Sequence, residues 1–488
     1  MLITARRVSH SSLVSPWSPF PVRWKFVTKT QVAIIGGGIS GLSAAYALHK
    51  RQVPYLLLEA GPRLGGVIRT ETRDGFLLEG GPDSMPAQRP EGIALCRELG
   101  LGDRLVPTNP DLQTVYVLHR RKLHLLPEGM VLAVPTKVLP FAKSSLFSWR
   151  GKLRMGLDLV IPGGNGRGDE SIASFLRRRL GQESVERLGE PLLAGIHSGD
   201  PERLSILATV PRLREIEETH GGLVRGMRAT PGPKPAPGAN APAAFCSLRG
   251  GLREMVDALV VRLERGRIWT KAAVYGVSRA NGGFSLAVQG GETVGADQVI
   301  VAAPGPKIAP ALEGLVPGAA RVLAAIPFAS SAVVLLGYRR EDVAHPLDGC
   351  GLVVPQTEGL RTTALSFVST KLPHRVPEGH VLLRGLLGGV RDEGAMGLSD
   401  DEMVDTVKRD MAEVLRLRGQ PVMRRVFRWP GGTPQLEVGH IERMAAVEKE
   451  FTAVPGLHLT GAGIRTTGIP DAVADGTGAG EAAAEGVR

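Results

Sequence analysis

Apolar and polar positions along the first 60 residues predict a sheet whose strands are joined through a helix. A predicted strand at residues 31–35, apolar after its first residue, is followed by apolar residues at helical spacing, Leu42, Ala45 and Leu48. A second apolar run then covers residues 55–58. Short, continuously apolar runs are typical of strands that are buried on both faces. This order predicts an α/β fold with a parallel, doubly wound sheet.

The rest of the pattern predicts further elements and more than one domain. A chain of 488 residues is too long for one small core, so two or three domains are expected. Residues 229–244 are rich in Pro, Ala and Gly and predict a loop or linker. Predicted helices cover residues 171–192, 400–417 and a stretch from about 471, and predicted strands cover 284–288, 299–303, 332–336 and 457–460.

The composition, with 43 % hydrophobic and 22 % charged residues, is ordinary for a globular protein. The formal net charge is +11, but residues 1–30 carry five basic and no acidic residues, which leaves 54 basic against 48 acidic residues in the body. A mildly basic body suits an anionic substrate or membrane surface, and no nucleic-acid motif accompanies it. The three widely separated cysteines, Cys96, Cys246 and Cys350, exclude a disulfide framework and any cysteine-based zinc or iron–sulfur site.

The N-terminal segment bears on where the protein works. No run of about 18 apolar residues occurs, so no membrane span is expected. Residues 1–30 are rich in Ser and Arg, as in organelle transit peptides, although Pro16, Pro19 and Pro21 disfavour the amphipathic helix of such peptides. We expect a tail on a cytoplasmic enzyme; a transit peptide with a mitochondrial or plastid location is the alternative.

A dinucleotide-binding turn lies between the first predicted strand and helix. Gly36, Gly38 and Gly41 form G-x-G-x-x-G, in which the first glycine permits the turn, the second admits a pyrophosphate and the third allows helix and strand to pack. The helix N-terminus offers N–H groups to the phosphates. Glu59 ends the second strand, where a carboxylate accepts hydrogen bonds from ribose hydroxyls and disfavours a 2′-phosphate. FAD and NAD are the remaining candidates.

Two further segments favour FAD. The run Arg-Leu-Gly-Gly at residues 63–66 resembles the R-x-G-G extension of the flavin amine oxidase superfamily. The run Gly-Ala-Gly at residues 461–463 lies between the last strand and the last helix, and a second helix N-terminus suits the electron-rich pyrimidine edge of a reduced flavin. A nicotinamide enzyme needs no such C-terminal return.

Motifs spread along the chain resemble those of the protoporphyrinogen and coproporphyrinogen oxidases. Residues 79–84, Glu-Gly-Gly-Pro-Asp-Ser, are similar to the E-x-G-P-x-S segment of that family, and residues 190–205 are the strongest match. Further similar blocks follow in family order at residues 245–252, 426–430, 434–440 and 457–470. The similarity runs from about residue 31 to the C-terminus, and several blocks are not shared with general flavin oxidases.

This resemblance implies an architecture and partners. It implies a discontinuous, Rossmann-like FAD-binding domain assembled from residues 31–90, 245–305 and 455–488. A largely helical domain at residues 125–225 and a mixed-sheet substrate domain at residues 306–450 are implied beside it. Helical domains of this family can dock on membranes, so peripheral membrane contact is implied, as is a downstream heme-pathway enzyme as a partner.

The resemblance also implies the chemistry, which is oxidation of a porphyrinogen to a porphyrin in heme biosynthesis, with O₂ as oxidant and H₂O₂ as by-product. The flavin performs the difficult step while the protein binds and orients the substrate, so no catalytic side chain and no metal are predicted. His197 lies in the strongest motif and is a candidate base, but packing is the preferred interpretation. The implied FAD contacts are Gly36, Gly38, Gly41, Glu59, Arg63, Gly65, Gly66, Val274, Gly463, Gly468 and Ile469.

Departures from the mammalian-type enzymes favour coproporphyrinogen III over protoporphyrinogen IX. Val115 and Cys350 stand where those enzymes carry an arginine for a propionate and an aromatic clamp. Arg89 falls where the Gram-positive type has a lysine that faces the substrate, and coproporphyrinogen has four propionates rather than two. The implied substrate contacts are Arg89, Gly195, Val353 and Leu386; a solvated loop position is the alternative for Arg89, and core packing is the alternative for the others.

Three other classes of protein remain as alternatives. Amine oxidases of the same superfamily use an aromatic pair near the flavin, and some attach FAD through a C-terminal cysteine, whereas this chain has no cysteine after Cys350 and no tyrosine after Tyr338. A carotenoid desaturase would lack the block at residues 190–205. A non-catalytic flavin-binding partner protein would bind FAD, but its flavin would not bleach with substrate in the absence of air.

Overall fold

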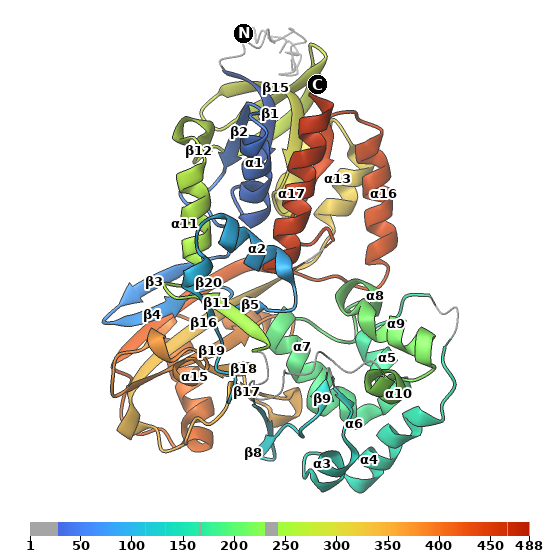
Figure 1. Cartoon of the computed structure of the whole chain (residues 1–488), viewed down its shortest axis with the longest axis vertical. Helices are drawn as coiled ribbons and strands as arrows, with labels where there is room; N and C mark the ends of the chain where they lie inside the picture. Colours follow the sequence, from blue (N-terminus) through green and yellow to red (C-terminus); the bar gives the residue numbers. More distant parts are fainter. Residues whose placement is uncertain are drawn as a thin grey trace, which may run out of the picture.

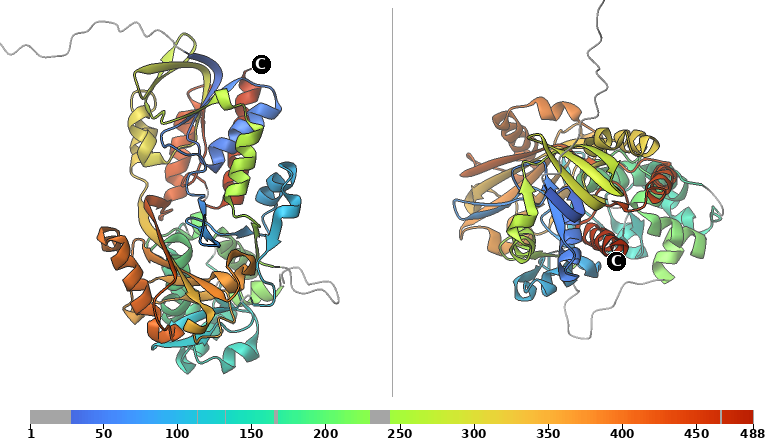
Figure 2. Two further views of the ribbon diagram at one scale, coloured as in Figure 1. Left: turned by 90° about the vertical axis from the view of Figure 1, so that its left-hand side faces the viewer. Right: turned by 90° about the horizontal axis from the view of Figure 1, so that it is seen from above.

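Two large sheets and a cluster of helices make up the molecule, as the computed structural model shows (Figures 1 and 2). The structure describes residues 28–112, 114–131, 133–164, 168–229, 243–465 and 467–487. The predicted linker at residues 229–244 and the predicted tail at residues 1–30 lie almost wholly outside the described residues.

The first sheet has seven strands contributed by both ends of the chain and its middle. β1 is parallel to β2 and β15, β12 is parallel to β2, and β21 is parallel to β15, whereas β13, β14 and β15 form an antiparallel meander. The strand order is β12 (Ile268–Thr270), β2 (Tyr55–Glu59), β1 (Thr28–Ile35), β15 (Glu292–Val301), β14 (Gly283–Val288) and β13 (Val274–Ala280), with β21 (Leu457–Leu459) also paired to β15.

Helices cover both faces of the first sheet, so the predicted doubly wound α/β fold is confirmed. Alternate residues of a strand point to opposite faces, and Val32 and Ile34 therefore face one helical layer while Ala33 and Ile35 face the other. The first layer contains α1 (Ile39–Lys50), α11 (Arg253–Arg262) and α17 (Ile469–Gly486), and the second contains α12 (Gly305–Leu312), α13 (Pro317–Ala324) and α16 (His440–Thr452).

The second sheet also has seven strands and is antiparallel except where β7 and β17 pair. Its order is β20 (Met423–Pro434), β16 (Phe328–Arg339), β19 (His380–Gly388), β18 (Ala364–Phe367), β17 (Gly351–Val353), β7 (Val115–His119) and β8 (Lys122–Leu125). Helix α15 (Asp400–Leu415) packs on one face, which we call the outer face, through Val407 and Met411. The opposite face is called the inner face.

A cluster of helices packs against part of the inner face through α7 (Glu190–His197), as Figure 1 shows. The continuous helix predicted at residues 171–192 is wrong. Gly181 has a φ of +92° and ends α5 (Ile172–Leu180), and two short turns precede α7, which starts with Pro191 in its first turn. The other helices of the cluster are α3 (Val138–Lys143), α4 (Trp149–Gly156), α6 (Gln182–Ser184), α8 (Ile206–Thr209), α9 (Pro211–His220) and α10 (Leu223–Ala229).

Small elements join these parts. They are the pairs β3 (Thr70–Arg73) with β4 (Phe76–Glu79) and β9 (Met130–Val131) with β10 (Val134–Pro135), the small sheet of β5 (Met85–Pro86), β11 (Phe245–Leu248) and β6 (Leu105–Pro107), and the helices α2 (Pro90–Glu98) and α14 (Val368–Lys371). Single turns of 3₁₀ or π helix are η1 (Gly102–Arg104), η2 (Leu157–Leu159), η3 (Val185–Gly189), η4 (Arg265–Arg267), η5 (Arg340–Asp342), η6 (Gln356–Glu358), η7 (Pro373–Arg375) and η8 (Glu393–Gly397).

Candidate functional site

The glycine turn between β1 and α1 leaves open space at the N-terminus of α1. Gly36 has a φ of +113°, and a Cβ on it would lie 2.8 Å from the carbonyl oxygen of Ala302. A Cβ on Gly41 would collide with the carbonyl oxygen of Gly36. Around Gly38, which caps α1, a Cβ would meet no described atom within 4 Å. The fold therefore requires Gly36 and Gly41, whereas Gly38 faces space that can admit a pyrophosphate.

Glu59 is held at the end of β2 by two backbone amides. Its Oε2 accepts a hydrogen bond from the amide of Gly37 at 2.7 Å, and its Oε1 accepts one from the amide of Gly61 at 2.6 Å. A carboxylate has about four acceptor positions, so capacity remains for hydroxyl donors. The segment before Val274 also lies at the end of β2, because the amide of Ala272 donates to the carbonyl oxygen of Glu59 at 2.9 Å.

The arginine–glycine segment after β2 is attached directly to the glycine turn. The amide of Gly65 donates to the carbonyl oxygen of Gly37 at 2.8 Å, and a Cβ on Gly66 would lie 3.3 Å from the Cα of Gly38. Both Gly65 and Gly66 have positive φ, at +99° and +56°. The guanidinium of Arg63 folds back and donates to the carbonyl oxygen of Gly66 at 2.5 Å. Arg63 therefore supports the shape of this loop.

A second glycine turn returns to the same sheet edge from the C-terminal part of the chain. Gly461 has a φ of +116°, and a Cβ on it would lie 3.3 Å from the carbonyl oxygen of Ala302, the same atom that limits Gly36. Helix α17 begins shortly after this turn, with Gly468 as its cap and Ile469 as its first residue. Two turns that are more than 400 residues apart in the sequence are therefore neighbours in space.

The residues at this sheet edge suit the separate parts of FAD. The N-terminus of α1 suits the pyrophosphate, the Glu59 carboxylate suits ribose hydroxyls, and the N-terminus of α17 suits the pyrimidine edge. Gly463 (φ +88°) packs on Pro434 at the end of β20, so this region also borders the second sheet. The predicted FAD contacts Gly36, Gly38, Gly41, Glu59, Arg63, Gly65, Gly66, Val274, Gly463, Gly468 and Ile469 lie on the segments described above.

Three of the predicted substrate contacts meet around Ala364 on the inner face of the second sheet. A Cβ on Gly195 of α7 would lie 3.1 Å from the Cβ of Ala364 and 3.9 Å from Cγ1 of Val353. In the sheet register, Ala364 pairs with both Val353 of β17 and Leu386 of β19. Helix α7 therefore packs directly on Ala364 at the position where the helix has no side chain, and the residues around this contact are apolar.

Arg89, the fourth predicted substrate contact, lies apart from this group at the start of α2. Its guanidinium forms an ion pair with Asp471 in the first turn of α17, and its side chain is 53 % exposed. The two helix starts pack together, because a Cβ on Gly92 would lie 3.5 Å from Cγ of Pro470. A substrate carboxylate at Arg89 would therefore share the guanidinium with Asp471.

His197 ends α7, and burial lowers its pKa to about 4. The imidazole is therefore neutral at neutral pH, and its protonated form is disfavoured. Its main-chain carbonyl oxygen accepts a hydrogen bond from Nε2 of Gln435 at 3.0 Å. This environment favours the packing interpretation.

Sequence reasoning missed a charged cluster that joins β4 and the loop after it to the second sheet. Nζ of Lys371 donates to both oxygens of Asp83, at 2.9 Å and 3.0 Å. Glu79 accepts a hydrogen bond from Nη2 of Arg375 at 3.3 Å. Gly81 lies between the two acids in the sequence, and its carbonyl oxygen accepts a hydrogen bond from Nη2 of Arg384 at 2.6 Å. The two acids lie in the 79–84 motif, but their basic partners follow almost 300 residues later with no local pattern to mark them.

Burial sets the ionisation of this cluster. It raises the pKa of Glu79 to about 7, against the lowering effect of Arg375. For Asp83, the neighbouring cations Lys371 and Arg384 overcome the opposing effect of burial and hold its pKa well below its usual range. Asp83 is therefore ionised near neutral pH, whereas Glu79 titrates there.

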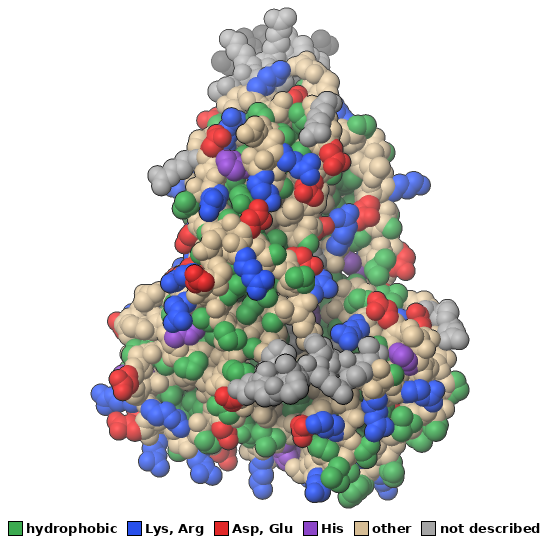
Figure 3. Space-filling model, in the orientation of Figure 1, with side chains coloured by type: hydrophobic (Ala, Val, Ile, Leu, Met, Phe, Trp, Pro, Cys, Tyr) green, Lys and Arg blue, Asp and Glu red, His purple; other side chains and the backbone are tan. Residues whose placement is uncertain are grey.

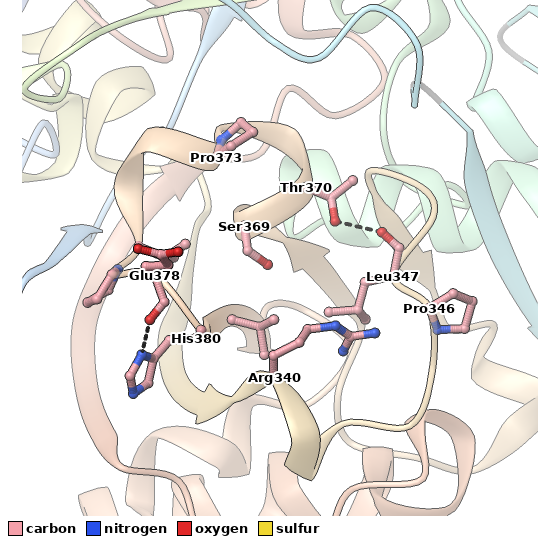
Figure 4. A pocket seen from close by; sticks show the side chains of 12 residues that line it. Arg340, Pro346, Leu347, Ser369, Thr370, Pro373, Glu378 and His380 are labelled. Atoms are coloured by element: carbon pink, nitrogen blue, oxygen red, sulfur yellow. Dashed lines mark hydrogen bonds between the residues drawn. The ribbon is translucent and has the colours of Figure 1, made fainter.

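A separate cavity of about 310 Å³ opens at one end of the second sheet (Figure 4). The guanidinium of Arg340 donates to the carbonyl oxygens of Val343 and His345, both at 2.8 Å. The hydroxyl of Thr370 donates to the carbonyl oxygen of Leu347 at 2.6 Å. The lining contains none of the predicted FAD or substrate contacts, so this cavity is not part of the candidate site.

The described part of the chain contains no group of three or more His, Cys, Asp or Glu side chains that could hold a metal ion. A search of the same residues finds no helix that is long and apolar enough to cross a bilayer.

Comparisons with known proteins identify the family. The model of the flavin-containing amine oxidoreductases matches residues 39–486. The chain is 36 % identical to the coproporphyrinogen III oxidase of Bacillus subtilis, over 92 % of this chain and 97 % of that protein. It is 32 % identical to the Staphylococcus aureus coproporphyrinogen III oxidase (92 % and 98 % covered) and 31 % identical to the chloroplastic protoporphyrinogen oxidase 1 of Arabidopsis thaliana (88 % and 84 % covered).

Solved structures of this family have the same fold. An Exiguobacterium protein assigned as a protoporphyrinogen oxidase superposes with a TM-score of 0.82 at 31 % identity, with 93 % of this chain and 98 % of that chain covered. The cyclohexylamine oxidase of Brevibacterium oxydans shares the fold, with a TM-score of 0.68 at 18 % identity and coverage of 93 % and 99 %. The chain therefore belongs to the flavin-containing amine oxidoreductases, among them to the porphyrinogen oxidases, and its cofactor is FAD.

Proposed function

We propose that this chain oxidises coproporphyrinogen III to coproporphyrin III in heme biosynthesis. The observation that carries the proposal is similarity over at least nine-tenths of the chain to bacterial coproporphyrinogen III oxidases. The apolar group of Gly195, Val353 and Leu386 on the inner face of the second sheet supports it, because a tetrapyrrole ring is large, flat and apolar.

The reaction removes six hydrogen atoms from the ring, consumes three molecules of O₂ and releases three of H₂O₂. Bound FAD supplies the two-electron acceptor for hydride, and O₂ takes up the electrons. The role of the side chains is then to bind and orient the ring: Val353 is buried and Leu386 is partly buried, and α7 packs on Ala364 between them through Gly195. The neutral imidazole of His197 has no acid–base role in this scheme.

The preference for coproporphyrinogen over protoporphyrinogen rests on two positions. Val115 pairs with Gly351 between β7 and β17, and it offers no cation to a propionate there. The thiol of Cys350 donates to the carbonyl oxygen of Leu112 at 3.1 Å and offers no aromatic clamp. We expect kcat/KM to be higher for coproporphyrinogen III than for protoporphyrinogen IX; the reverse order would overturn this preference but not the family.

Arg89 provides a second test of the same preference. Arg89→Ala should lower kcat/KM more for the substrate with four propionates than for the substrate with two, by about tenfold or less because the site is half exposed. The Arg89→Gln variant keeps most of the size without the charge and should recover little activity. Equal losses on both substrates would assign Arg89 to the contact between α2 and α17 alone.

We also propose peripheral contact with an anionic membrane surface, on the cytoplasmic side. The proposal is supported by the exposed apolar side chains of α4 and the turn after it: Trp149, Leu153 and Val160 are 71 %, 72 % and 73 % exposed. Lys143 and Arg150 lie close by in the sequence (lower right of Figure 3). The FAD-loaded protein should sediment with vesicles containing phosphatidylglycerol and less with pure phosphatidylcholine. A Trp149→Ser, Leu153→Ser variant that sediments equally well would rule out this surface.

A downstream heme-pathway enzyme as a partner stays a prediction.

A further inference from the structure

The inner face of the second sheet is apolar around the predicted ring contacts, but two arginines lie near them. Alternate residues of a strand share a face, so Arg384 points to the same side as Leu386 of β19. The register agrees, because Arg384 pairs with Leu335 of β16, and Leu335 pairs in turn with Arg425 of β20. Arg384 and Arg425 therefore lie on the inner face, on either side of Leu335.

The two arginines differ in their partners. Nε and Nη2 of Arg425 donate to the two oxygens of Glu71, at 2.8 Å and 3.1 Å. Arg384 forms no ion pair with any residue in the described ranges, and its Nη2 donates to the carbonyl oxygen of Gly81. Nε of Arg384 is buried and has no hydrogen-bond partner among the described residues. Arg425 thus has a carboxylate at hydrogen-bond distance, whereas no carboxylate among the described residues lies within ion-pair distance of Arg384, which acts on Asp83 only from further away.

The two acids of this cluster already have basic partners. Both oxygens of Asp83 accept from Lys371, and Glu79 accepts from Arg375. The cluster thus holds three cations, Lys371, Arg375 and Arg384, against two carboxyl groups. A partly buried guanidinium without a counter-ion is poorly solvated in the free chain, and it gains a charge-assisted hydrogen bond when a carboxylate arrives.

We propose that Arg384 binds one carboxylate of the substrate and so determines the preference for carboxylate-rich tetrapyrroles. Two residues along a strand span about 7 Å, which a propionate and a guanidinium can bridge when the ring lies on Leu386. Arg384 should contribute more than Arg89, because Arg89 already holds Asp471 and is half exposed. This inference rests on the proposed function, since it names how the proposed substrate is recognised.

The test compares the binding of coproporphyrin III and of its uncharged tetramethyl ester to the FAD-loaded protein, measured by porphyrin fluorescence. In Arg384→Gln we expect the Kd of the acid to rise about tenfold, with little change for the ester. The matched control is Arg425→Gln, an arginine on the same face with its own counter-ion, which should leave the ratio of acid to ester binding unchanged. An equal change for acid and ester in Arg384→Gln would overturn the proposal and leave Arg384 as a support of the 79–84 loop.

Two further measurements keep the test decisive. If Arg384→Gln does not retain FAD, Arg384→Lys keeps the charge but loses the guanidinium fork, and it should reduce the discrimination between acid and ester about threefold at full FAD content. Unchanged discrimination in that variant would contradict the proposal, as would a wild type that binds acid and ester equally. A wild type that binds coproporphyrin tightly but does not oxidise coproporphyrinogen would contradict the proposed function without contradicting this binding site.

Discussion

The β1–α1 turn, Glu59 and the start of α17 form an edge of the first sheet that we call the FAD edge. This edge and the inner face of the second sheet are built by different means. The FAD edge is shaped mainly by the main chain. Gly36 and Gly461 adopt positive φ in its turns, and Gly41 lets the start of α1 pack against the first turn. On the inner face side chains from β17, β18 and β19 supply the surface, and only Gly195 acts through the absence of a side chain. A main-chain site needs a fixed spacing of glycines, whereas a side-chain site can be assembled from residues far apart in the sequence.

The largest effect is expected when one carbon atom is added at the FAD edge. Gly38→Ala should leave the FAD-free chain as stable as wild type, because the new Cβ meets no described atom within 4 Å and φ is −71°. It should nevertheless weaken FAD binding by about 100-fold, since the methyl group occupies the space assigned to the pyrophosphate. Titration of the FAD-free protein with FAD and thermal unfolding of the same sample measure the two effects.

The matched control is Gly41→Ala, whose Cβ would collide with the carbonyl oxygen of Gly36. It should destabilise the FAD-free chain itself. Equal FAD affinity in Gly38→Ala and wild type would show that the pyrophosphate does not lie at this turn.

The next largest effect is expected at Glu59. Glu59→Ala removes the acceptor for the amides of Gly37 and Gly61 as well as the proposed ribose contact, so FAD affinity should fall about 10- to 100-fold. Glu59→Gln keeps one acceptor oxygen and should lose less. Full flavin occupancy with unchanged affinity in purified Glu59→Ala would exclude the ribose role.

A smaller effect is expected on the inner face. Gly195→Leu should lower kcat/KM for coproporphyrinogen about tenfold while FAD content stays at the wild-type level, because the added side chain does not fit against Ala364 and must shift α7 and the predicted ring contacts beside it. Gly195→Ala should cost less, since its Cβ lies 3.1 Å from the Cβ of Ala364 and requires only a small shift. Loss of FAD together with activity in Gly195→Leu would show that α7 supports the FAD edge rather than a substrate surface.

The smallest effect concerns Glu79, which lies between the two regions. Because burial raises its pKa to about 7 from the ordinary 4.5, the folded chain holds a proton that the unfolded chain has lost between these pH values. The contribution of Glu79 to stability therefore falls as the pH rises through this window. Glu79→Gln removes that dependence, so its Tm relative to wild type should rise by about 1–3 °C between pH 5 and pH 8. Parallel Tm curves for the two proteins would contradict the raised pKa.

The sequence predicted the α/β fold and the elements of the FAD edge because each signal there is local. The β1–α1–β2 unit, the start of α17 near residue 471 and the helix from Asp400 were confirmed within a few residues. The helix expected at residues 171–192 failed, because Gly181 ends α5 in a conformation that apolar spacing does not reveal. Arg384, which we propose as a substrate contact, was not predicted for another reason: its place on the inner face depends on strand register, and its lack of an ion pair among the described residues depends on Lys371 already holding Asp83.

Anaerobic mixing of the FAD-loaded wild type with coproporphyrinogen III, followed through the flavin absorbance, tests the central claim most directly. If the chain is an FAD-dependent porphyrinogen oxidase, the flavin band should bleach on mixing, return when air is admitted, and be accompanied by coproporphyrin and H₂O₂ in a ratio of one to three. A flavin that keeps its absorbance with both coproporphyrinogen III and protoporphyrinogen IX would contradict the account and favour a non-catalytic flavin-binding protein.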